Sequence, residues 1–214
     1  MNVGLNHIDK HFGAVHANAD ISLAINAGEI FGILGENGAG KSTLMKILSG
    51  FIQPDSGEIV LDGELVSIHA PSDAINYGIG MLHQDPLDFP PMQVIDNFVV
   101  GAGGGLVLTH KDTIQEFRDL QTQFGFSLDP ETYVDTLTVG ERQQLEILRL
   151  LWLGARVLIL DEPTTGISAQ QKEKLFAALK VLAKQGKTII FVSHKLEDVE
   201  ILCDRVAILR KGEL

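Results

Sequence analysis

The strongest chemical signal is a glycine-rich segment with the spacing G-x-x-x-x-G-K-S/T, which we call the phosphate loop. Its residues are Gly35, Glu36, Asn37, Gly38, Ala39, Gly40, Lys41, Ser42 and Thr43. It lies between the apolar run Ile30–Leu34, an expected strand, and an expected helix over Lys41–Leu48. In such a loop, backbone N–H groups converge on phosphate oxygens, the lysine reaches the β- and γ-phosphates and the serine ligates magnesium. We therefore expect nucleotide binding here rather than a ligand-free glycine turn.

A second signal is the pair of adjacent acids Asp161 and Glu162, directly after the apolar run Val157–Leu160. This run is expected to be a buried strand, and ligands of open α/β sheets bind at the carboxyl ends of strands. Neighbouring carboxylates repel each other unless a cation lies nearby. We expect Asp161 to hold magnesium, directly or through a water, and Glu162 to act as general base on the attacking water. The plainer alternative is a strand that ends in two solvated acids.

A third segment combines a threonine and a glutamate at the spacing of a capping box. Thr138, Val139, Gly140 and Glu141 precede an amphipathic stretch, so Thr138 is expected to cap a helix and Glu141 to bond back to it. An uncovered helix N-terminus can also bind an anion. The residues alone favour the ordinary cap over the anion site.

The rest of the chain supplies the elements that must position these residues. Alternating apolar residues predict short antiparallel strands within His7–Asn26, and a second β segment is expected over Gly57–Ile68. Further on, strands alternate with helices, which predicts an α/β fold with a mostly parallel sheet covered on both sides. The expected strands are Ile79–His83, Val157–Leu160, Thr188–Val192 and Val206–Leu209, and the expected helices cover Ala169–Ala183 and begin at Lys195.

The middle of the chain, about 85–153, changes in character. Prolines are followed by a glycine cluster at Gly101 and Gly103–Gly105 and then by helical periodicity. We interpret it as an inserted helical subdomain, with the glycine cluster as a loop between two helices. Residues 1–84 and 154–214 are expected to form the core. Because Arg210–Leu214 reads as one strand turning toward another, we expect the chain to be truncated at its C-terminus.

The composition limits the class of protein. The 214 residues are 45% hydrophobic with a mean hydropathy of +0.16, enough to bury a core. With 17 basic and 28 acidic residues, the net charge of −11 has the wrong sign for general nucleic-acid binding. No apolar run reaches the roughly 20 residues of a membrane span and no secretion signal is apparent, so we expect a soluble, cytosolic chain. The one cysteine, Cys203, is expected to be a small buried apolar residue.

In this order and spacing, the phosphate loop, the stretch Leu137–Gln144 and the strand end before Glu162 resemble the ATP-binding domain of ABC transporters. The resemblance covers almost the whole chain. It implies the fold of a phosphate-loop NTPase with an N-terminal antiparallel β subdomain and an inserted helical subdomain, and it implies ATP hydrolysis with ATP and Mg²⁺. Leu137–Gln144 corresponds to the family's signature motif. Its residues Thr138–Glu141, which we call the signature turn, would contact the nucleotide of a paired domain.

The resemblance implies further site residues. Gln84 matches the Q-loop glutamine near magnesium and the γ-phosphate, His194 matches the switch histidine, and Phe12 stands where an aromatic ring stacks on adenine. The implied catalytic residues are Lys41, Gln84, Glu162 and His194, and the implied magnesium ligands are Ser42, Gln84 and Asp161. Considered alone, Gln84 would be an ordinary loop residue and His194 a cap or surface residue. Phe12 could equally be a core aromatic.

One position departs from the family. After the residue that matches Glu162, the family usually has Pro-Thr-x-x-Leu-Asp. This chain ends the same stretch with Ile167-Ser168, so the D-loop aspartate is replaced by Ser168. The usual contact of that aspartate between paired domains is therefore in doubt. The replacement, with the segments Phe12–Asn18 and Val139–Leu148, is similar to the first ATPase half of tandem ATPases that energise sugar and nucleoside importers.

The resemblance thus implies an importer ATPase that pairs head to tail with a second nucleotide-binding domain, in the same full-length chain or as a homodimer. Its other implied partners are transmembrane permease subunits and, indirectly, an extracytoplasmic solute-binding protein, with no nucleic acid. It would lie peripherally on the cytoplasmic face of the membrane. One alternative is a soluble ABC ATPase acting on ribosomes or DNA ends, for which a basic insertion would be expected. Another, left open by Ser168, is a regulatory half-site that hydrolyses ATP weakly.

Overall fold

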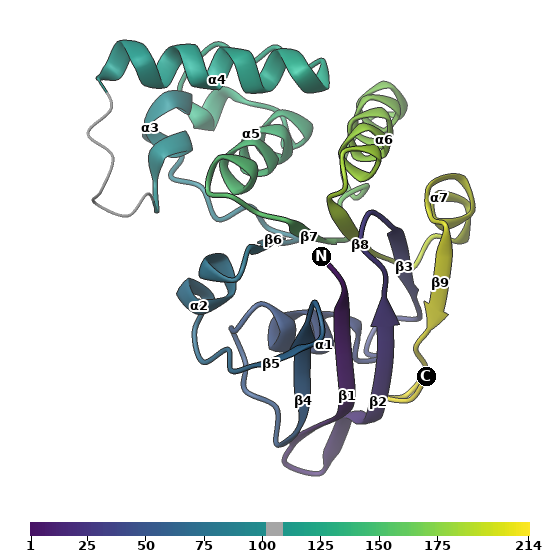
Figure 1. Cartoon of the computed structure of the whole chain (residues 1–214). Coiled ribbons are helices and arrows are strands. Elements are labelled where there is room, and N and C mark those ends of the chain that lie inside the picture. The colour runs from purple at the N-terminus through teal and green to yellow at the C-terminus, as the bar shows by residue number, and fades with distance from the viewer. Residues whose placement is uncertain (102–108) are drawn as a thin grey trace.

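The computed structural model of the chain describes residues 1–101 and 109–214 and contains two β-sheets (Figure 1). One is antiparallel, in the order β2-β1-β4-β5, and the other is parallel, in the order β6-β7-β8-β3-β9. The antiparallel strands are β1 (Val3–Phe12), β2 (Val15–Ile25), β4 (Ser56–Leu61) and β5 (Glu64–Val66). The parallel strands are β3 (Ile30–Leu34), β6 (Ile79–Leu82), β7 (Val157–Asp161), β8 (Thr188–Ser193) and β9 (Arg205–Ile208).

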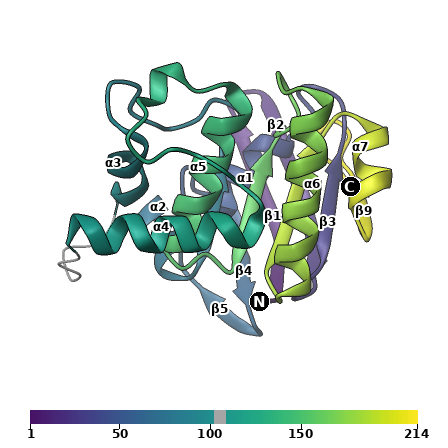
Figure 2. The ribbon, with the colours of Figure 1, turned by 90° about the horizontal axis from the view of Figure 1, so that it is seen from above.

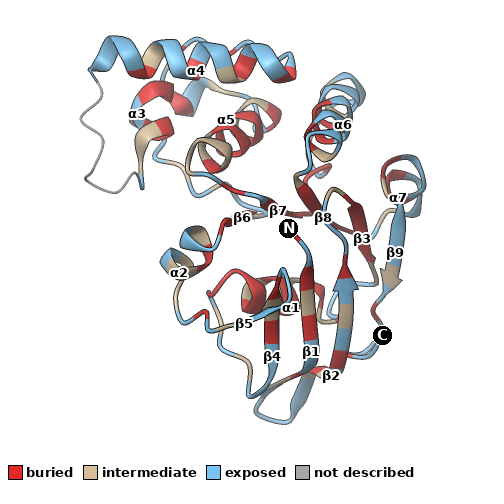
Figure 3. Cartoon of the chain, viewed as in Figure 1, coloured by how far each residue is buried: buried red, intermediate tan, exposed pale blue. Residues whose placement is uncertain are grey.

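Except at its edge strand β9, the parallel sheet is covered on both faces, as its nearly continuous apolar strands predict. Along β7, Val157 and Ile159 belong to a core shared with α1 (Lys41–Leu48) and the antiparallel sheet. Leu158 and Leu160 belong to a second core, formed with α5 (Val139–Trp152), α6 (Ala169–Lys184) and α7 (Leu196–Leu202). Figure 3 shows β3, β6, β7 and β8 as a largely buried layer between the two groups of elements, while the edge strand β9 is largely exposed. The sheet is thus a fixed support for the loops that leave its strands.

The antiparallel sheet differs from its prediction. β1 and β2 run for 10 and 11 residues, not as the short strands expected. Their pairing contains register shifts between Leu5 and His11, so the alternation of apolar and polar residues is interrupted along the strand. The segment expected over 57–68 is a hairpin that turns at Asp62 and Gly63, which have φ of 50° and 91°. The short helix α2 (Pro71–Asn76) was not predicted.

In the described residues between 85 and 153, the helices are α3 (Val94–Val99), α4 (His110–Phe124) and α5, with a 3-10 turn at Val134–Thr136. They pack through aromatic rings, since the Phe98 centroid lies 5.0 Å from that of Phe117 and 4.9 Å from that of Trp152. Figure 2 shows α4 lying across α5. This region is helical as expected, and its independence as a subdomain remains a prediction.

Two further sequence expectations concern the glycine-rich loop after α3 and membrane-spanning segments. Gly101 follows α3 with φ 89°, while Gly103–Gly105, the rest of the predicted linking loop, lie outside the described residues. Within the described ranges, every helix is too short or too polar to cross a lipid bilayer.

Candidate nucleotide-binding site

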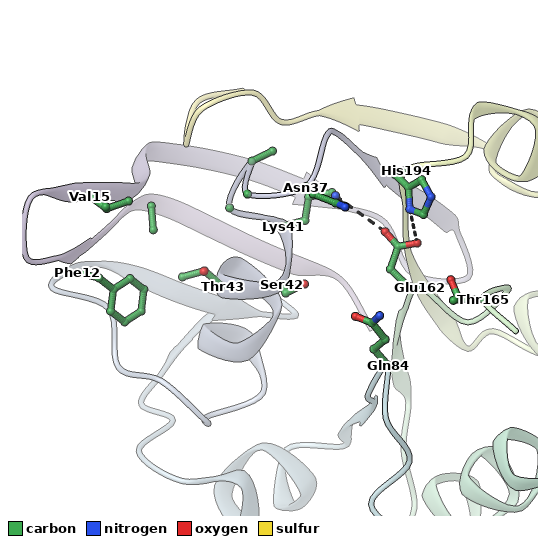
Figure 4. A pocket seen from close by; sticks show the side chains of 14 residues that line it. Phe12, Val15, Asn37, Lys41, Ser42, Thr43, Gln84, Glu162, Thr165 and His194 are labelled. Atoms are coloured by element: carbon green, nitrogen blue, oxygen red, sulfur yellow. Dashed lines mark hydrogen bonds and ion pairs between the residues drawn. The ribbon is translucent and has the colours of Figure 1, made fainter. Parts of the chain in front are cut away.

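Segments from four parallel strands meet at one edge of the sheet. The phosphate loop follows β3, Gln84 lies two residues beyond β6, and Glu162 and His194 directly follow β7 and β8. Parallel strands end at the same edge, so these loops converge on an open pocket of about 520 Å³ (Figure 4). The pocket is lined by Phe12, Val15, Ala17, Asn37, Gly38, Ala39, Gly40, Lys41, Ser42, Thr43, Gln84, Glu162, Thr165 and His194. The predicted residues Gly35 and Glu36 border an adjoining hollow instead.

The phosphate loop has a backbone that only glycine can supply at one end. Gly40 precedes α1 with φ 102°, and a Cβ there would lie 2.1 Å from the Ala17 carbonyl oxygen. Gly38 has φ 80°, but a Cβ there would meet nothing within 4 Å, because this side of the loop faces open space. The loop is therefore fixed against β2 at its base and free where a phosphate would approach.

Lys41 is buried, and its ammonium is held inside the phosphate loop. Nζ donates to the carbonyl oxygens of Gly35, at 2.7 Å, and Glu36, at 3.0 Å. It also lies 3.9 Å from Glu162 Oε1. These contacts satisfy the buried charge and hold it at the floor of the pocket, where it can meet phosphate oxygens.

Glu162 is held in an unusual backbone conformation and by a histidine. Its φ is 53°, a left-handed value that a non-glycine residue adopts only where the surroundings enforce it. Its backbone N–H donates to the Val192 carbonyl, which ties this turn to β8. Its Oε2 lies 2.8 Å from His194 Nδ1 (Figure 4). The carboxylate is therefore aimed into the pocket, where it contacts His194, whose side chain is itself 46% exposed.

Asp161 lies behind the pocket lining and fits a magnesium site. It is 4% exposed, and its Oδ1 has no hydrogen-bond partner among the described residues. Burial raises its pKa, a hydrogen bond from Ser42 opposes that shift, and the charge of Glu162 raises the pKa further. An unpartnered carboxylate oxygen beside a serine hydroxyl is a suitable donor set for a hard cation such as Mg²⁺. Ser42 and Gln84, its predicted companions, line the adjacent pocket.

The far end of the pocket is apolar and comes from the β1–β2 hairpin. Figure 4 shows Phe12 and Val15 across the phosphate loop from Glu162 and His194. Phe12 is 49% exposed, so the alternative that it is a core aromatic is wrong. An exposed ring at this end can stack on a flat base, and Val15 widens the same apolar surface.

The signature turn does not line this pocket in the described part of the chain. It begins α5, where the Thr138 hydroxyl accepts from the Glu141 N–H at 3.3 Å and donates to Glu141 Oε2 at 2.7 Å. Glu141 Oε2 also accepts from the Thr138 N–H at 2.8 Å. The predicted capping box is therefore confirmed, and the predicted nucleotide contact requires another molecule or domain.

Several contacts at the site were not predicted. Gln171 of α6 donates from Nε2 to the Thr138 hydroxyl at 3.0 Å, although the two residues are 33 positions apart. Arg142 forms two hydrogen bonds with the Asp88 carboxylate, at 2.6 and 2.5 Å, and so ties α5 to the segment after Gln84. No local spacing signals either pair. Val15, Ala17 and Thr165 were also missed as lining residues, and Ser168, expected as a D-loop substitute, caps α6 in a second capping box.

Comparisons with known proteins agree with this geometry. Residues 19–165 match the family model described as ABC transporter. The chain is 39% identical over 208 residues to the nucleoside import ATP-binding protein NupA of Lactococcus lactis subsp. cremoris. The aligned region covers 96% of this chain and 41% of the relative. It is 39% identical over 215 residues to the ribose import ATP-binding protein RbsA 2 of Streptomyces avermitilis, covering 99% of this chain and 43% of the relative.

A solved structure has the same fold. It is a dimeric post-hydrolysis state of an ATP-binding cassette bound to ADP and Pi. The TM-score is 0.86 at 22% sequence identity, and the match covers 99% of this chain and 96% of the chain in that structure. The chain spans less than half the length of the two curated relatives. The family match contains the phosphate loop, the signature turn and the Asp161–Glu162 pair. The chain therefore belongs to the ABC transporter family and is an ATP-binding domain of it.

Proposed function

We propose that this chain is an ATP-hydrolysing domain that energises an ABC importer for sugars or nucleosides. The observation that carries the proposal is the pocket, where Glu162 lies between the Lys41 ammonium and the His194 imidazole. The Glu162 carboxylate, as the base, thus lies next to both a phosphate-binding ammonium and an imidazole. The relatives are named as nucleoside import and ribose import ATP-binding proteins, which supports the proposal of an importer and of these solute classes.

The side chains divide the work of phosphoryl transfer. The phosphate-loop N–H groups and Lys41 bind the β- and γ-phosphates. Glu162 orients the attacking water and accepts its proton. The hydrogen bond from His194 fixes the Glu162 carboxylate, and the histidine side chain, 46% exposed, can turn to the γ-phosphate. Phe12 stacks on the adenine from the opposite end.

Magnesium belongs to the same proposal. Ser42, Asp161 and Gln84 would hold the ion, which neutralises charge on the phosphates when bound. The unpartnered Asp161 oxygen and the neighbouring Ser42 support this assignment. Asp161 and Glu162 would then have different roles: one stays behind the pocket with the ion, and the other faces the water.

The signature turn is proposed to complete the pocket of a paired domain. Thr138 and Glu141 lie outside the chain's own pocket, so they are available to ATP bound elsewhere. The dimeric cassette bound to ADP and Pi supports such pairing. The second domain would lie in the same full-length chain or in a second copy, and ATP would join the two until hydrolysis releases the contacts.

Movement would reach the membrane through the helical region. We assign residues 1–84 and 154–214 to the ATPase core and about 85–153 to a helical subdomain. The Asp88–Arg142 pair supports a link between the Gln84 segment and the signature helix. Permease subunits would hold the protein at the cytoplasmic face of the membrane, and an extracytoplasmic solute-binding protein would act on it indirectly.

The proposal is tested on the full-length native protein, purified by affinity from detergent-solubilised membranes. We expect mass spectrometry to find multi-span permease subunits and a solute-binding protein, and ATP hydrolysis to depend on Mg²⁺. A soluble pool with ribosomal or DNA-repair proteins would replace the importer by a soluble ABC ATPase. Permease subunits together with tight ATP binding but negligible turnover at this pocket would make it a regulatory half-site, for which Ser168 is the supporting residue.

A further inference from the structure

The β1–β2 hairpin brings together three side chains that the ATPase pocket does not use. Asp9 and His11 lie on β1, His16 lies on β2, and His11 and His16 are directly paired across the two strands. Phe12 and Val15, between the two histidines, pair at the end of the ladder. Residues seven positions apart in the sequence are therefore held on one small patch, at the end of the hairpin away from the helices α3 to α5 (Figure 1).

The geometry of this patch is close to that of a metal site. The His11 and His16 rings are stacked, with centroids 3.8 Å apart and planes 14° from parallel. His16 Nε2 lies 2.5 Å from Asp9 Oδ1. One ligand atom from each of the three residues lies within 4.8 Å of the others. Rotation of the two rings out of their stack would bring two ring nitrogens and one carboxylate oxygen onto a common ion, for which metal–ligand distances of about 2.0–2.2 Å are needed.

Neighbouring groups hold the patch and give it a negative potential. The Asp20 N–H donates to Asp9 Oδ2 at 3.2 Å, and the His11 N–H donates to Asp55 Oδ2 at 2.6 Å. Lys10 is paired with Asp55 at 2.7 Å, so its charge is directed to that carboxylate rather than to Asp9. A cation is therefore attracted to a set of donors that is already fixed in part.

We propose that Asp9, His11 and His16 form a binding site for a transition-metal ion of the zinc class. Two imidazoles and one carboxylate suit Zn²⁺, Ni²⁺ or Cu²⁺, whereas Mg²⁺ and Ca²⁺ prefer oxygen ligands. The patch is open to solvent, since the His16 and Asp9 side chains are 43% and 28% exposed, so water can fill the remaining coordination positions. This site is distinct in position and chemistry from the magnesium site at Asp161.

An ion here would tie β1 to β2 across the base of the turn that carries Phe12 and Val15. Both residues line the nucleotide pocket, so an occupied site restrains the apolar end of that pocket. Metal binding itself depends only on the hairpin and stands whether or not the chain hydrolyses ATP. The two proposals therefore fail independently.

The test is calorimetric titration of the chain with ZnCl₂ in a buffer without nucleotide or Mg²⁺, because phosphates also bind zinc. We expect one Zn²⁺ per chain at this site, with MgCl₂ giving no heat there. His11→Ala and His16→Ala should each weaken Zn²⁺ binding tenfold or more. Substituting Co²⁺ should give a visible absorption band that both variants lose.

His69→Ala is the matched control, since His69 is exposed and lies outside the hairpin, and its zinc affinity should equal that of the parent chain. All three substitutions are at exposed positions, and a thermal melt of each variant checks that it is folded. Zinc affinity unchanged in both His11→Ala and His16→Ala, or lowered equally in His69→Ala, would overturn the site.

Discussion

The N-termini of α1 and α5, both of which we propose to meet phosphate, are built in opposite ways. α1 begins after Gly40, and among the described residues no side chain caps it. α5 begins after Thr138, whose hydroxyl and backbone N–H are both bonded to Glu141. The first helix end has no such cap and keeps its N–H donors for a ligand, whereas the second satisfies two of its own, the N–H groups of Thr138 and Glu141.

This difference shows how one domain can contribute to two sites. We expect the uncapped N-terminus next to the buried Lys41 to bind phosphate without any partner. The signature turn is already hydrogen-bonded within the chain, and we expect it to contact a phosphate only if another domain brings one to it. The comparison therefore predicts that changes in the phosphate-loop pocket alter nucleotide binding by the single domain, whereas changes in the signature turn leave that binding unchanged and alter hydrolysis by the paired protein.

The largest effect is expected from Glu162→Gln in the full-length protein. The variant keeps the shape of the side chain but cannot accept a proton, so hydrolysis should fall by about 10²–10⁴-fold while ATP binding persists. Steady-state phosphate release measures the first quantity and equilibrium binding the second. Glu173→Gln, on the exposed face of α6, is the control and should leave both unchanged. Normal turnover in Glu162→Gln would remove Glu162 from its role as base.

Lys41→Ala should act on the chain without a partner. Loss of the ammonium removes charge-assisted hydrogen bonds to phosphate, each of about 1.5–3 kcal/mol, so nucleotide affinity should fall by roughly 10–100-fold. Calorimetric titration of the single domain with ATP and Mg²⁺ measures this loss. Lys174→Ala, an exposed lysine of α6, should bind as the parent chain does. Unchanged affinity in Lys41→Ala would contradict the assignment of the phosphate loop.

Much of the nucleotide pocket could be predicted from the sequence. Apolar runs such as Val157–Leu160 mark strands covered on both faces, and parallel strands end at one edge. Glu162 was expected at that edge from its apolar run, while Gln84 and His194 were implied by the family resemblance, and all three line the pocket beside the phosphate loop. The capping box at Thr138 was also predicted by a local pattern and is confirmed, whereas the magnesium role of Gln84 was implied only by the family resemblance and stays a prediction.

The remaining contacts could not be predicted, for a physical reason. The bond from Gln171 to Thr138 and the Arg142–Asp88 pair join residues 33 and 54 positions apart, and no periodicity relates them. The long β1 and β2 strands were missed because register shifts interrupt their alternation. Local patterns predict elements and their ends, whereas these contacts depend on how the elements pack.

Thr138→Ala sharpens the comparison from the side of the signature turn. Losing the cap should lower the free energy of unfolding by about 0.5–2 kcal/mol, while ATP affinity of the single domain stays unchanged. Hydrolysis by the paired protein should fall by roughly tenfold, since one hydrogen-bond donor to phosphate is lost. Chemical denaturation, calorimetry and phosphate release measure the three quantities.

Thr109→Ala is the matched control for that variant. Thr109 caps α4 by the same hydroxyl-to-backbone bond, to the Asp112 N–H at 3.3 Å, so it should lose similar stability. It lies at the start of a helix with no proposed phosphate contact, and hydrolysis should stay normal. If both variants lose hydrolysis equally, the effect of Thr138 is one of stability and the signature turn has no separate role.

The smallest effect is expected from Gln171, and two substitutions separate its two bonds. Gln171 Oε1 accepts from the Ser168 N–H at 3.0 Å, and Nε2 donates to the Thr138 hydroxyl. Gln171→Ala loses both, whereas Gln171→Glu keeps the acceptor for Ser168 and loses only the donor. If α6 positions the signature turn, both variants should lower hydrolysis by the paired protein several-fold, from a hydrogen bond of about 0.5–1.5 kcal/mol. If only Gln171→Ala lowers hydrolysis, then hydrolysis depends on the capping of α6 and not on the contact to Thr138.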